Sequence, residues 1–248
     1  LDTPDGDRAI VTKTVVPLLH EPPAREPYLV TLPCEEDLGA FVDVVRGLRR
    51  TMVFPTAPTL RHVLLDAPAG TDPAAGPDAL QLGHWNFFGA VHGDARTVEL
   101  LLPLVEEAFA AVPGARLFRV ADRPADPADA LRVRAAALAG RAPQDPAGLR
   151  DRLGPGGARI DVCTVAPATA ETATALDALA RERCAAAGFA YLAAFTVGPR
   201  ELRQACSIVY DGTSPEAEAR ALALCRALVR DSRAAGARAS RARRVPGD

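Results

Sequence analysis

The strongest constraint on the fold is a strand–helix–strand pattern between Gly156 and Glu216. Two segments, Arg159–Val165 and Phe189–Val197, alternate apolar and polar residues with the period of two that half-buried strands have. The Ala-rich run between them, Thr169–Ala187, has the composition and length of a helix. This stretch therefore predicts a helix that packs against neighbouring strands.

The same two periods recur along the rest of the chain. Strands are predicted at Ala9–Leu18, Tyr28–Leu32, Thr59–Leu65, His84–Val91, Leu117–Val120 and Ala205–Tyr210, helices at Glu35–Arg50, Ala95–Ala111, Asp129–Leu138 and Ser214–Ala235, and connectors at Asp66–Asp78 and Arg141–Gly157. Repeated strand–helix–strand units predict an α+β fold, a ferredoxin-like antiparallel sheet with helices packed on one face. A doubly wound parallel sheet is less favoured, because the sequence has no glycine-rich strand-to-helix turn of the dinucleotide-binding form.

Composition narrows the class of protein. The 248 residues are 48% hydrophobic, enough for a sizeable core. No apolar run has the length of a membrane span and the N-terminus carries no basic-then-apolar leader, so we expect a soluble cytoplasmic protein without a membrane partner. The net charge of −2 gives no overall attraction to nucleic acid. The arginines between Arg230 and Arg244 are predicted to form a solvated helix end and a frayed tail.

Neither the cysteines nor the histidines predict a metal site. The five cysteines are odd in number and far apart, mostly within apolar periodic segments, which indicates buried thiols more than a disulfide framework. The four histidines lie on separate segments without metal-ligand spacing, so surface or capping roles are predicted. These residues are Cys34, Cys163, Cys184, Cys206 and Cys225, and His20, His62, His84 and His92.

Four stretches resemble the vanillyl-alcohol oxidase and 4-cresol dehydrogenase family of flavoproteins, and they follow one another along the chain in the same order as in the family. HWNFFGAVHGDARTVE resembles the family's WNLYGALYG strand-to-helix entry. GGARIDVCTVAP and AAGFAYLAAFTVGPRELRQACSIVYDGTSPE are similar to a later segment of those enzymes. AIVTKTVVPLLHEPPAREPYLVTLPCEEDLGAFVDVVRGLR is similar to the place where they leave the flavin domain and enter the cap.

The resemblance implies a domain organisation and a chemistry. In that family an N-terminal domain binds FAD, a cap covers the isoalloxazine ring, and para-substituted phenols are oxidised by hydride transfer to the flavin. The present sequence corresponds to the cap, without the preceding flavin domain or the segment that follows the cap. The predicted division is a strand from the flavin-domain junction at residues 1–22, the cap at 23–236 and a basic tail at 237–248.

The resemblance also places the family's functional positions on residues of this chain. The His that tethers FAD corresponds to Arg159, and the aromatic residue two positions on corresponds to Asp161. The Tyr-Arg pair that binds and deprotonates the phenol corresponds to Ser240 and Arg241, so Arg241 is the candidate catalytic residue. A guanidinium cannot form the flavin bond. The resemblance therefore implies a chain without the tether and without the catalytic tyrosine.

Strand alternation adds candidate pocket residues. Arg159, Asp161 and Cys163 fall on one face of a strand, the face that the resemblance turns toward the flavin. That face could bind a polar ligand, although a partner interface or a solvated edge is the commoner use of such residues. Tyr191 and Phe195 share a face and could line a pocket, with core packing as the simpler interpretation. The predicted substrate pocket is Arg159, Asp161, Cys163, Tyr191, Phe195, Arg203 and Gln204, the last two at the positions of a His-His pair in the family.

Three functions fit these observations, and the sequence leaves all three open, including whether the chain is an enzyme. The first is the cap portion of a FAD-linked oxidoreductase acting on para-substituted phenols, completed by a separately encoded flavin subunit or truncated, and not redox-active by itself. FAD is the cofactor in the family, and we expect this chain alone to bind none. The second is a flavin-free cap that became a non-redox enzyme or binds a small aromatic ligand. The third is an interaction module that forms a homo-oligomer or covers a partner.

Overall fold

The fold was analysed in a computed structural model, which describes residue 13 and residues 21–49, 54, 57–66, 81–123, 125–126, 129–138 and 156–245. Its elements are β1 (Ala24–Leu32), α1 (Asp37–Leu48), β2 (Thr59–His62), η2 (Val63–Leu65), β3 (Trp85–Gly93), α2 (Ala95–Ala110), β4 (Arg116–Arg119), η4 (Val120–Asp122), α3 (Ala130–Leu138), β5 (Gly157–Pro167), α4 (Ala170–Ala187), β6 (Ala193–Val197), β7 (Glu201–Asp211), α5 (Pro215–Ala234) and β8 (Arg238–Val245). The strand predicted at Ala9–Leu18, except residue 13, and most of both predicted connectors lie outside the described residues.

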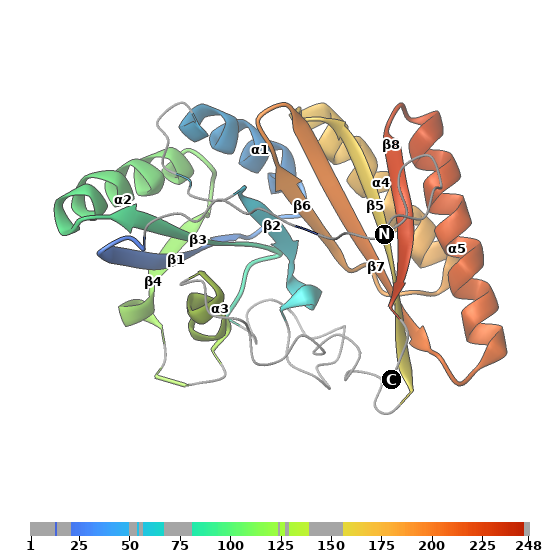
Figure 1. Cartoon of the computed structure of the whole chain (residues 1–248). Coiled ribbons are helices and arrows are strands. Elements are labelled where there is room, and N and C mark those ends of the chain that lie inside the picture. Colours follow the sequence, from blue (N-terminus) through green and yellow to red (C-terminus); the bar gives the residue numbers. More distant parts are fainter. Residues whose placement is uncertain are drawn as a thin grey trace.

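The strands form one antiparallel sheet of eight, in the order β4-β1-β3-β2-β6-β7-β5-β8. This order consists of two ferredoxin-like units, β1-α1-β2-β3-α2-β4 and β5-α4-β6-β7-α5-β8, each a βαββαβ run. The units meet where β2 pairs with β6, through Thr59–Thr196, Leu60–Phe195 and Arg61–Ala194. Figure 1 shows the two units side by side along the continuous sheet.

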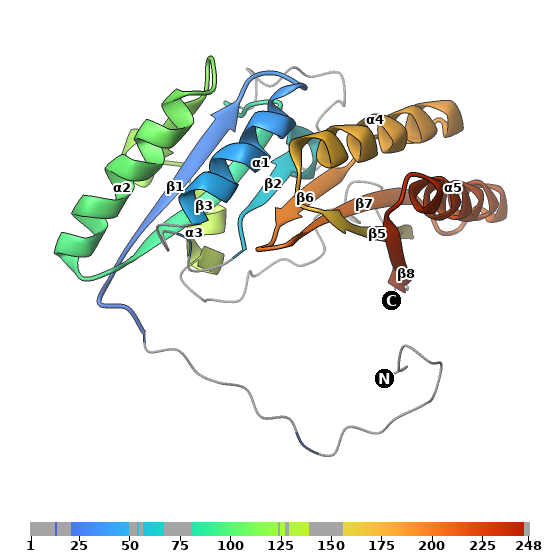
Figure 2. The ribbon, with the colours of Figure 1, turned by 90° about the horizontal axis from the view of Figure 1, so that it is seen from above.

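Four helices cover one face of this sheet. In Figure 2, α1, α2, α4 and α5 lie above the strands, and α3 lies below them. The predicted α+β fold with an antiparallel sheet and helices packed on one face is confirmed, and α3 is an addition on the opposite face. Residues between the two units supply α3, which explains why it stands outside the repeated pattern.

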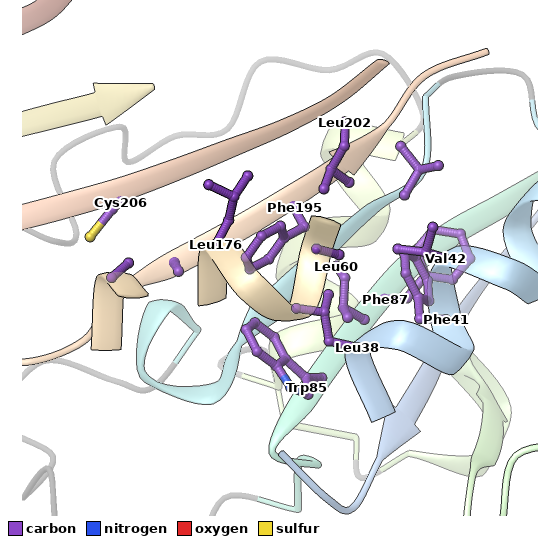
Figure 3. Close-up of a cluster of buried hydrophobic side chains, with 14 of the residues drawn as sticks. Leu38, Phe41, Val42, Leu60, Trp85, Phe87, Leu176, Phe195, Leu202 and Cys206 are labelled. Carbon is purple, nitrogen blue, oxygen red and sulfur yellow. The ribbon is translucent and has the colours of Figure 1, made fainter. Parts of the chain in front are cut away.

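The main core fills the space between the sheet and the four helices. Phe41 of α1 contacts Phe87 of β3 with ring centroids 5.4 Å apart, and Trp85 contacts Phe195 across the two units at 5.7 Å. Figure 3 shows these rings with Leu38, Val42, Leu60, Leu176 and Leu202 around them. Because residues from both units enter this one cluster, we expect the units to fold as a single cooperative body.

A smaller core holds α3 against the opposite face. Leu131 of α3 packs with Leu29, Val63, Leu82 and Phe88. A buried ion pair next to it, Arg123 Nη2 to Asp129 Oδ2 at 2.6 Å, is less than one-twentieth exposed at both ends, and Asp129 Oδ1 also accepts the backbone N–H of Leu131. These bonds cap the start of α3 and fix where it lies on the sheet.

Local sequence signals explain most helix boundaries. Thr169, Asp94 and Ser214 each accept a backbone N–H in the first turn of the helix that follows, as N-cap residues do. Gly188 ends α4 with φ +70°, a left-handed conformation that favours glycine. The N–H of Phe189 then bonds back to the carbonyl of Cys184 at 2.9 Å. This cap holds Phe189 and explains why β6 begins at Ala193 and not at the predicted Phe189.

Other predicted boundaries were also wrong. The strands β1 and β7 each begin four residues before the predicted start, at Ala24 and at Glu201. The strand predicted at Thr59–Leu65 ends at His62, because the Nδ1 atom of His62 accepts the N–H of Leu64 and starts the short helix η2. The basic end, predicted as a frayed tail, instead forms β8, which pairs with β5 from Arg159–Val245 to Val165–Arg238. The arginine-rich composition of this segment does not predict a strand. It is compatible with one here because β8 is an edge strand, and edge strands tolerate charged residues that central strands do not.

Candidate functional site

The face of the sheet opposite the four helices carries the predicted polar residues of β5. Residues of β5 alternate in burial, with Ile160 and Val162 buried on the helix side and Arg159, Asp161 and Cys163 half-buried on the other. The predicted alternation is therefore confirmed. Half-burial of charged side chains on a sheet face distinguishes this surface from an ordinary solvated one.

A row of small side chains crosses this face, and we call it the floor. It consists of Ala194 on β6, Ala205 on β7 and Cys163 on β5, which are successive partners in the strand register, together with Ser207. These side chains extend little above the strands, so the floor is flat compared with the helix side. A flat, largely apolar floor suits a planar ring lying against it.

One charged network borders the floor on β5. Arg159 Nε donates to Asp161 Oδ1 at 2.6 Å, and the hydroxyl of Ser207 donates to the same oxygen at 2.7 Å. The side chains of Arg159 and Asp161 are 29% and 18% exposed. Partial burial reduces the screening of this pair by water and salt. Asp161, at the position where the resemblance expects an aromatic residue, thus serves as the acceptor that orients Arg159.

A second network borders the floor on β2. Arg61 Nε donates to both oxygens of Asp66, at 2.9 and 3.0 Å, and Arg134 of α3 reaches Asp66 Oδ1 at 2.7 Å. Burial lowers the pKa of Arg61; the charge of Asp66 opposes this shift, and the positive charges of Arg134 and Arg159 add to it. All three guanidinium groups therefore share one electrostatic environment at the floor.

Sequence reasoning missed this second network. Alternation in Thr59–Leu65 could have turned Arg61 to this face, but no sequence signal showed that β2 lies beside β6. Asp66 and Arg134 come from a turn and from the added helix α3, so their meeting with Arg61 depends on tertiary packing alone.

The remaining predicted pocket residues do not gather at the floor. Arg203 is on the floor side of β7 but exposed, and it pairs with Glu201 at 2.5 Å. Gln204 is buried on the helix side, where its Nε2 donates to the carbonyl of Leu176 at 3.1 Å. The predicted single pocket is thus divided between two faces of the sheet, because neighbouring strand residues point to opposite sides.

Tyr191 and Phe195 are also on the helix side, within the main core. Their placement matches core packing, the simpler of the two interpretations. Arg241, the candidate catalytic residue, lies in β8 at the point where the register with β5 shifts between Asp161 and Cys163. Because β8 pairs with β5, which carries Cys163 of the floor, the backbone of Arg241 lies one strand away from the floor.

A polar cluster, which sequence reasoning also missed, lies on the helix side where the two units meet, with Asp177 and Tyr191 buried at its centre. The hydroxyl of Tyr191 donates to Asp177 of α4. Arg181, one turn further along α4, donates to Asp177 Oδ2 at 2.9 Å and pairs with Glu35 Oε1 at 2.7 Å. Burial, followed by the charge of Asp177, raises the pKa of Tyr191 well above its ordinary value. We call Glu35, His62, His84, Asp177, Arg181 and Tyr191 the seam cluster.

The two histidines of the seam cluster stack edge to face. Their ring centroids are 4.9 Å apart, and His62 also contacts the ring of Tyr191 at 5.3 Å. Burial lowers the pKa of His62 to about 3, with smaller contributions from His84 and Arg181. The capping role predicted for the histidines fits His62, which caps η2, but His62 is buried and not on the surface.

Two cysteines lie in contact behind the floor, with Cys184 Sγ and Cys206 Sγ 3.8 Å apart. Both are thiols and both are buried, as the sequence predicted. Within the described residues, no three His, Cys, Asp or Glu side chains are grouped so that they could hold a metal ion. In the same part of the chain, no helix is long and apolar enough to span a membrane.

Known proteins are similar to this chain in sequence and in fold. The chain is 26% identical over 228 residues to the 4-cresol dehydrogenase (hydroxylating) flavoprotein subunit of Pseudomonas putida, which covers 86% of this chain. Among solved structures, 4-ethylphenol oxidase from Gulosibacter chungangensis, in its isoeugenol complex, superposes with a TM-score of 0.80 at 24% identity, and p-cresol methylhydroxylase with substrate bound superposes with 0.78 at 23%. Each covers 87% of this chain. The family resemblance is confirmed.

The match is to part of each relative of the 4-cresol dehydrogenase type. The chain spans 43% of the curated subunit and 45% and 44% of the two solved structures, the share expected of a cap domain. The fold is accordingly the cap-domain fold of FAD-linked oxidases. Alkyldihydroxyacetonephosphate synthase shares it more distantly, with a TM-score of 0.56 at 15% identity. No family model matches the sequence.

Proposed function

We propose that this chain is the cap, or substrate-binding portion, of a FAD-linked oxidoreductase that acts on para-substituted phenols. One observation carries the proposal: the floor is a flat, half-buried surface on the sheet face that the family resemblance turns toward the flavin. The 4-cresol and 4-ethylphenol in the relatives' names support a para-substituted phenol as the substrate class.

The residues present fit a flavin that is held without a covalent bond. At the position expected for the tether, the guanidinium of Arg159 is engaged with Asp161 at 2.6 Å. When bound, FAD would supply the hydride acceptor, a chemistry that amino-acid side chains do not provide.

The chain's own residues would bind and orient the substrate. Arg159, fixed by Asp161 and Ser207, places a positive charge beside the floor, where an anionic group of the substrate would be stabilised. Arg61, fixed by Asp66, does the same from the opposite border. Without a flavin-binding domain these groups could bind a phenol and exclude water from it, but could not oxidise it.

Purification of the protein from the cells that make it, through an affinity tag added at its own gene, tests the proposal. We expect an absorption spectrum of flavin with about one flavin per copy of this chain, whether the flavin domain is in the same polypeptide or in a partner. After denaturation the flavin should separate from the protein, because Arg159 stands at the tether position and a guanidinium cannot form the flavin bond. A colourless protein would refute the proposal and favour the flavin-free ligand-binding cap, which the ion pair at the tether position also fits.

A further inference from the structure

We propose that the floor binds aromatic ligands that carry a carboxylate, and that Arg61 and Arg159 recognise this group. The inference narrows the proposed function to phenols with an anionic para substituent. It rests on that function for the reaction, but the binding itself requires only the residues of this chain.

The two arginines border the floor from opposite sides. In the strand register Arg61 of β2 pairs with Ala194, Ala194 pairs with Ala205, and Ala205 pairs with Cys163 of β5. Arg159 lies four residues before Cys163 on β5. Three strand spacings of about 4.8 Å separate β2 from β5, a span of about 14 Å. The span between these two strand backbones is wider than a single aromatic ring.

The charges around the floor are unequal. Three guanidinium groups lie at these two networks: Arg61 and Arg134 both bond to Asp66, and Arg159 bonds to Asp161. Two carboxylates oppose them, and both are already used: Asp66 accepts from two arginines, and Asp161 accepts from one arginine and Ser207. One positive charge is left over at a half-buried surface, where an anion would be screened only weakly.

The geometry of the guanidinium groups favours a carboxylate. Arg61 and Arg159 both engage their carboxylates through Nε. A guanidinium has five N–H donors in a planar fork, so donors remain for a second acceptor. A carboxylate matches this fork with its two oxygens, whereas a neutral alkyl substituent would provide neither a hydrogen-bond acceptor nor a negative charge. Recognition of an anion therefore involves Arg159, which stands at the position of the family's tether, together with Arg61.

Calorimetric titration of this chain with 4-hydroxyphenylacetate and with 4-ethylphenol tests the inference. The two probes share a para-substituted phenol ring and differ in the carboxylate. We expect 4-hydroxyphenylacetate to bind at least about tenfold more tightly at low salt, since a hydrogen bond to a charged group contributes that much. Added salt should reduce the preference.

Arg61→Gln and Arg159→Gln should each remove most of that preference. Both variants should fold, because Asp66 keeps Arg134 and Asp161 keeps Ser207, and thermal melting verifies this. Arg226→Gln, an exposed position on α5 behind the sheet, is the matched control and should bind as the parent does.

Equal binding of the two probes, binding of neither, or a preference that survives both floor variants would overturn the inference. Its failure can be told apart from that of the proposed function, because the titration does not involve flavin. Carboxylate binding by a protein that purifies colourless would leave the anion site standing and remove the oxidoreductase. A flavin-containing protein that binds both phenols equally would support the oxidoreductase and remove the anion site.

Discussion

Acidification should destabilise the seam between the two ferredoxin-like units through His62. The pKa of His62 is about 3 in the folded chain, against an ordinary value of 6.5, because burial disfavours the charged ring. Between these two values the unfolded chain binds more protons than the folded chain, so stability falls as pH falls below 6.5 and the loss is complete near 3. At pH 5 this effect lowers the free energy of unfolding by about 2 kcal/mol relative to neutral pH.

Neighbouring groups act in the same direction. His84 stacks on His62, and its pKa is lowered by burial and by Arg181. Protonating either ring would place a positive charge in a cluster whose two carboxylates are already engaged, Asp177 by Arg181 and Tyr191 and Glu35 by Arg181. Measurement at pH 5 avoids most carboxylate titration, which occurs nearer pH 4.

Urea unfolding at pH 7.5 and pH 5.0 measures this effect in the parent and in His62→Asn. Asparagine is a good N-cap residue, so the variant can keep the acceptor that starts η2 while losing the titrating ring. We expect the parent to lose about 2 kcal/mol more than the variant on acidification. Equal losses in the two proteins would show that His62 does not carry the acid sensitivity and would refute the reasoning.

Three further predictions concern the buried groups that hold the fold together. Asp177→Ala should cost about 3 kcal/mol in urea unfolding, because it leaves the buried hydroxyl of Tyr191 without its acceptor and removes one of the two carboxylates that Arg181 contacts, and a cost under about 1 kcal/mol would argue against the seam cluster. Arg123→Met should cost a similar amount, about 3 kcal/mol, and should make α3 the first site of proteolysis, since it strands a buried carboxylate; unchanged cleavage would contradict this. In native protein Cys34 should react readily with Ellman's reagent while Cys184 reacts only after denaturation, and similar rates would contradict the buried placement.

Period and composition predicted most elements because helix and strand periods come from local backbone geometry. The helices α1, α2, α4 and α5 lie within two residues of the ranges predicted for them. The boundaries that differ depend on side chains acting at a distance of a few residues, as His62 does at the end of β2. The strand β8 was missed because its sequence is arginine-rich and its partner β5 precedes it by a helix, a strand pair and another helix.

The candidate site was predicted in part. Alternation correctly placed Arg159, Asp161 and Cys163 on one face, because that property belongs to a single strand. The contribution of Arg61 depends on the pairing of β2 with β6, which joins the two units and has no sequence signal. Gln204 was assigned to the same pocket by resemblance, and its burial behind the sheet shows that position in an aligned segment does not fix which face a side chain occupies.

The central claim, that the floor closes over a flavin and its substrate, is tested most directly by filling the floor. Ala205→Phe places a ring on it, while Ala223→Phe makes the same change at an exposed position of α5 behind the sheet. In the natively purified protein without oxygen, we measure the rate at which the best para-substituted phenol reduces the flavin. We expect Ala205→Phe to slow this reduction at least about a hundredfold, the cost of misplacing reactants by about 1 Å, and Ala223→Phe to leave it unchanged. Equal rates in both variants would contradict the account.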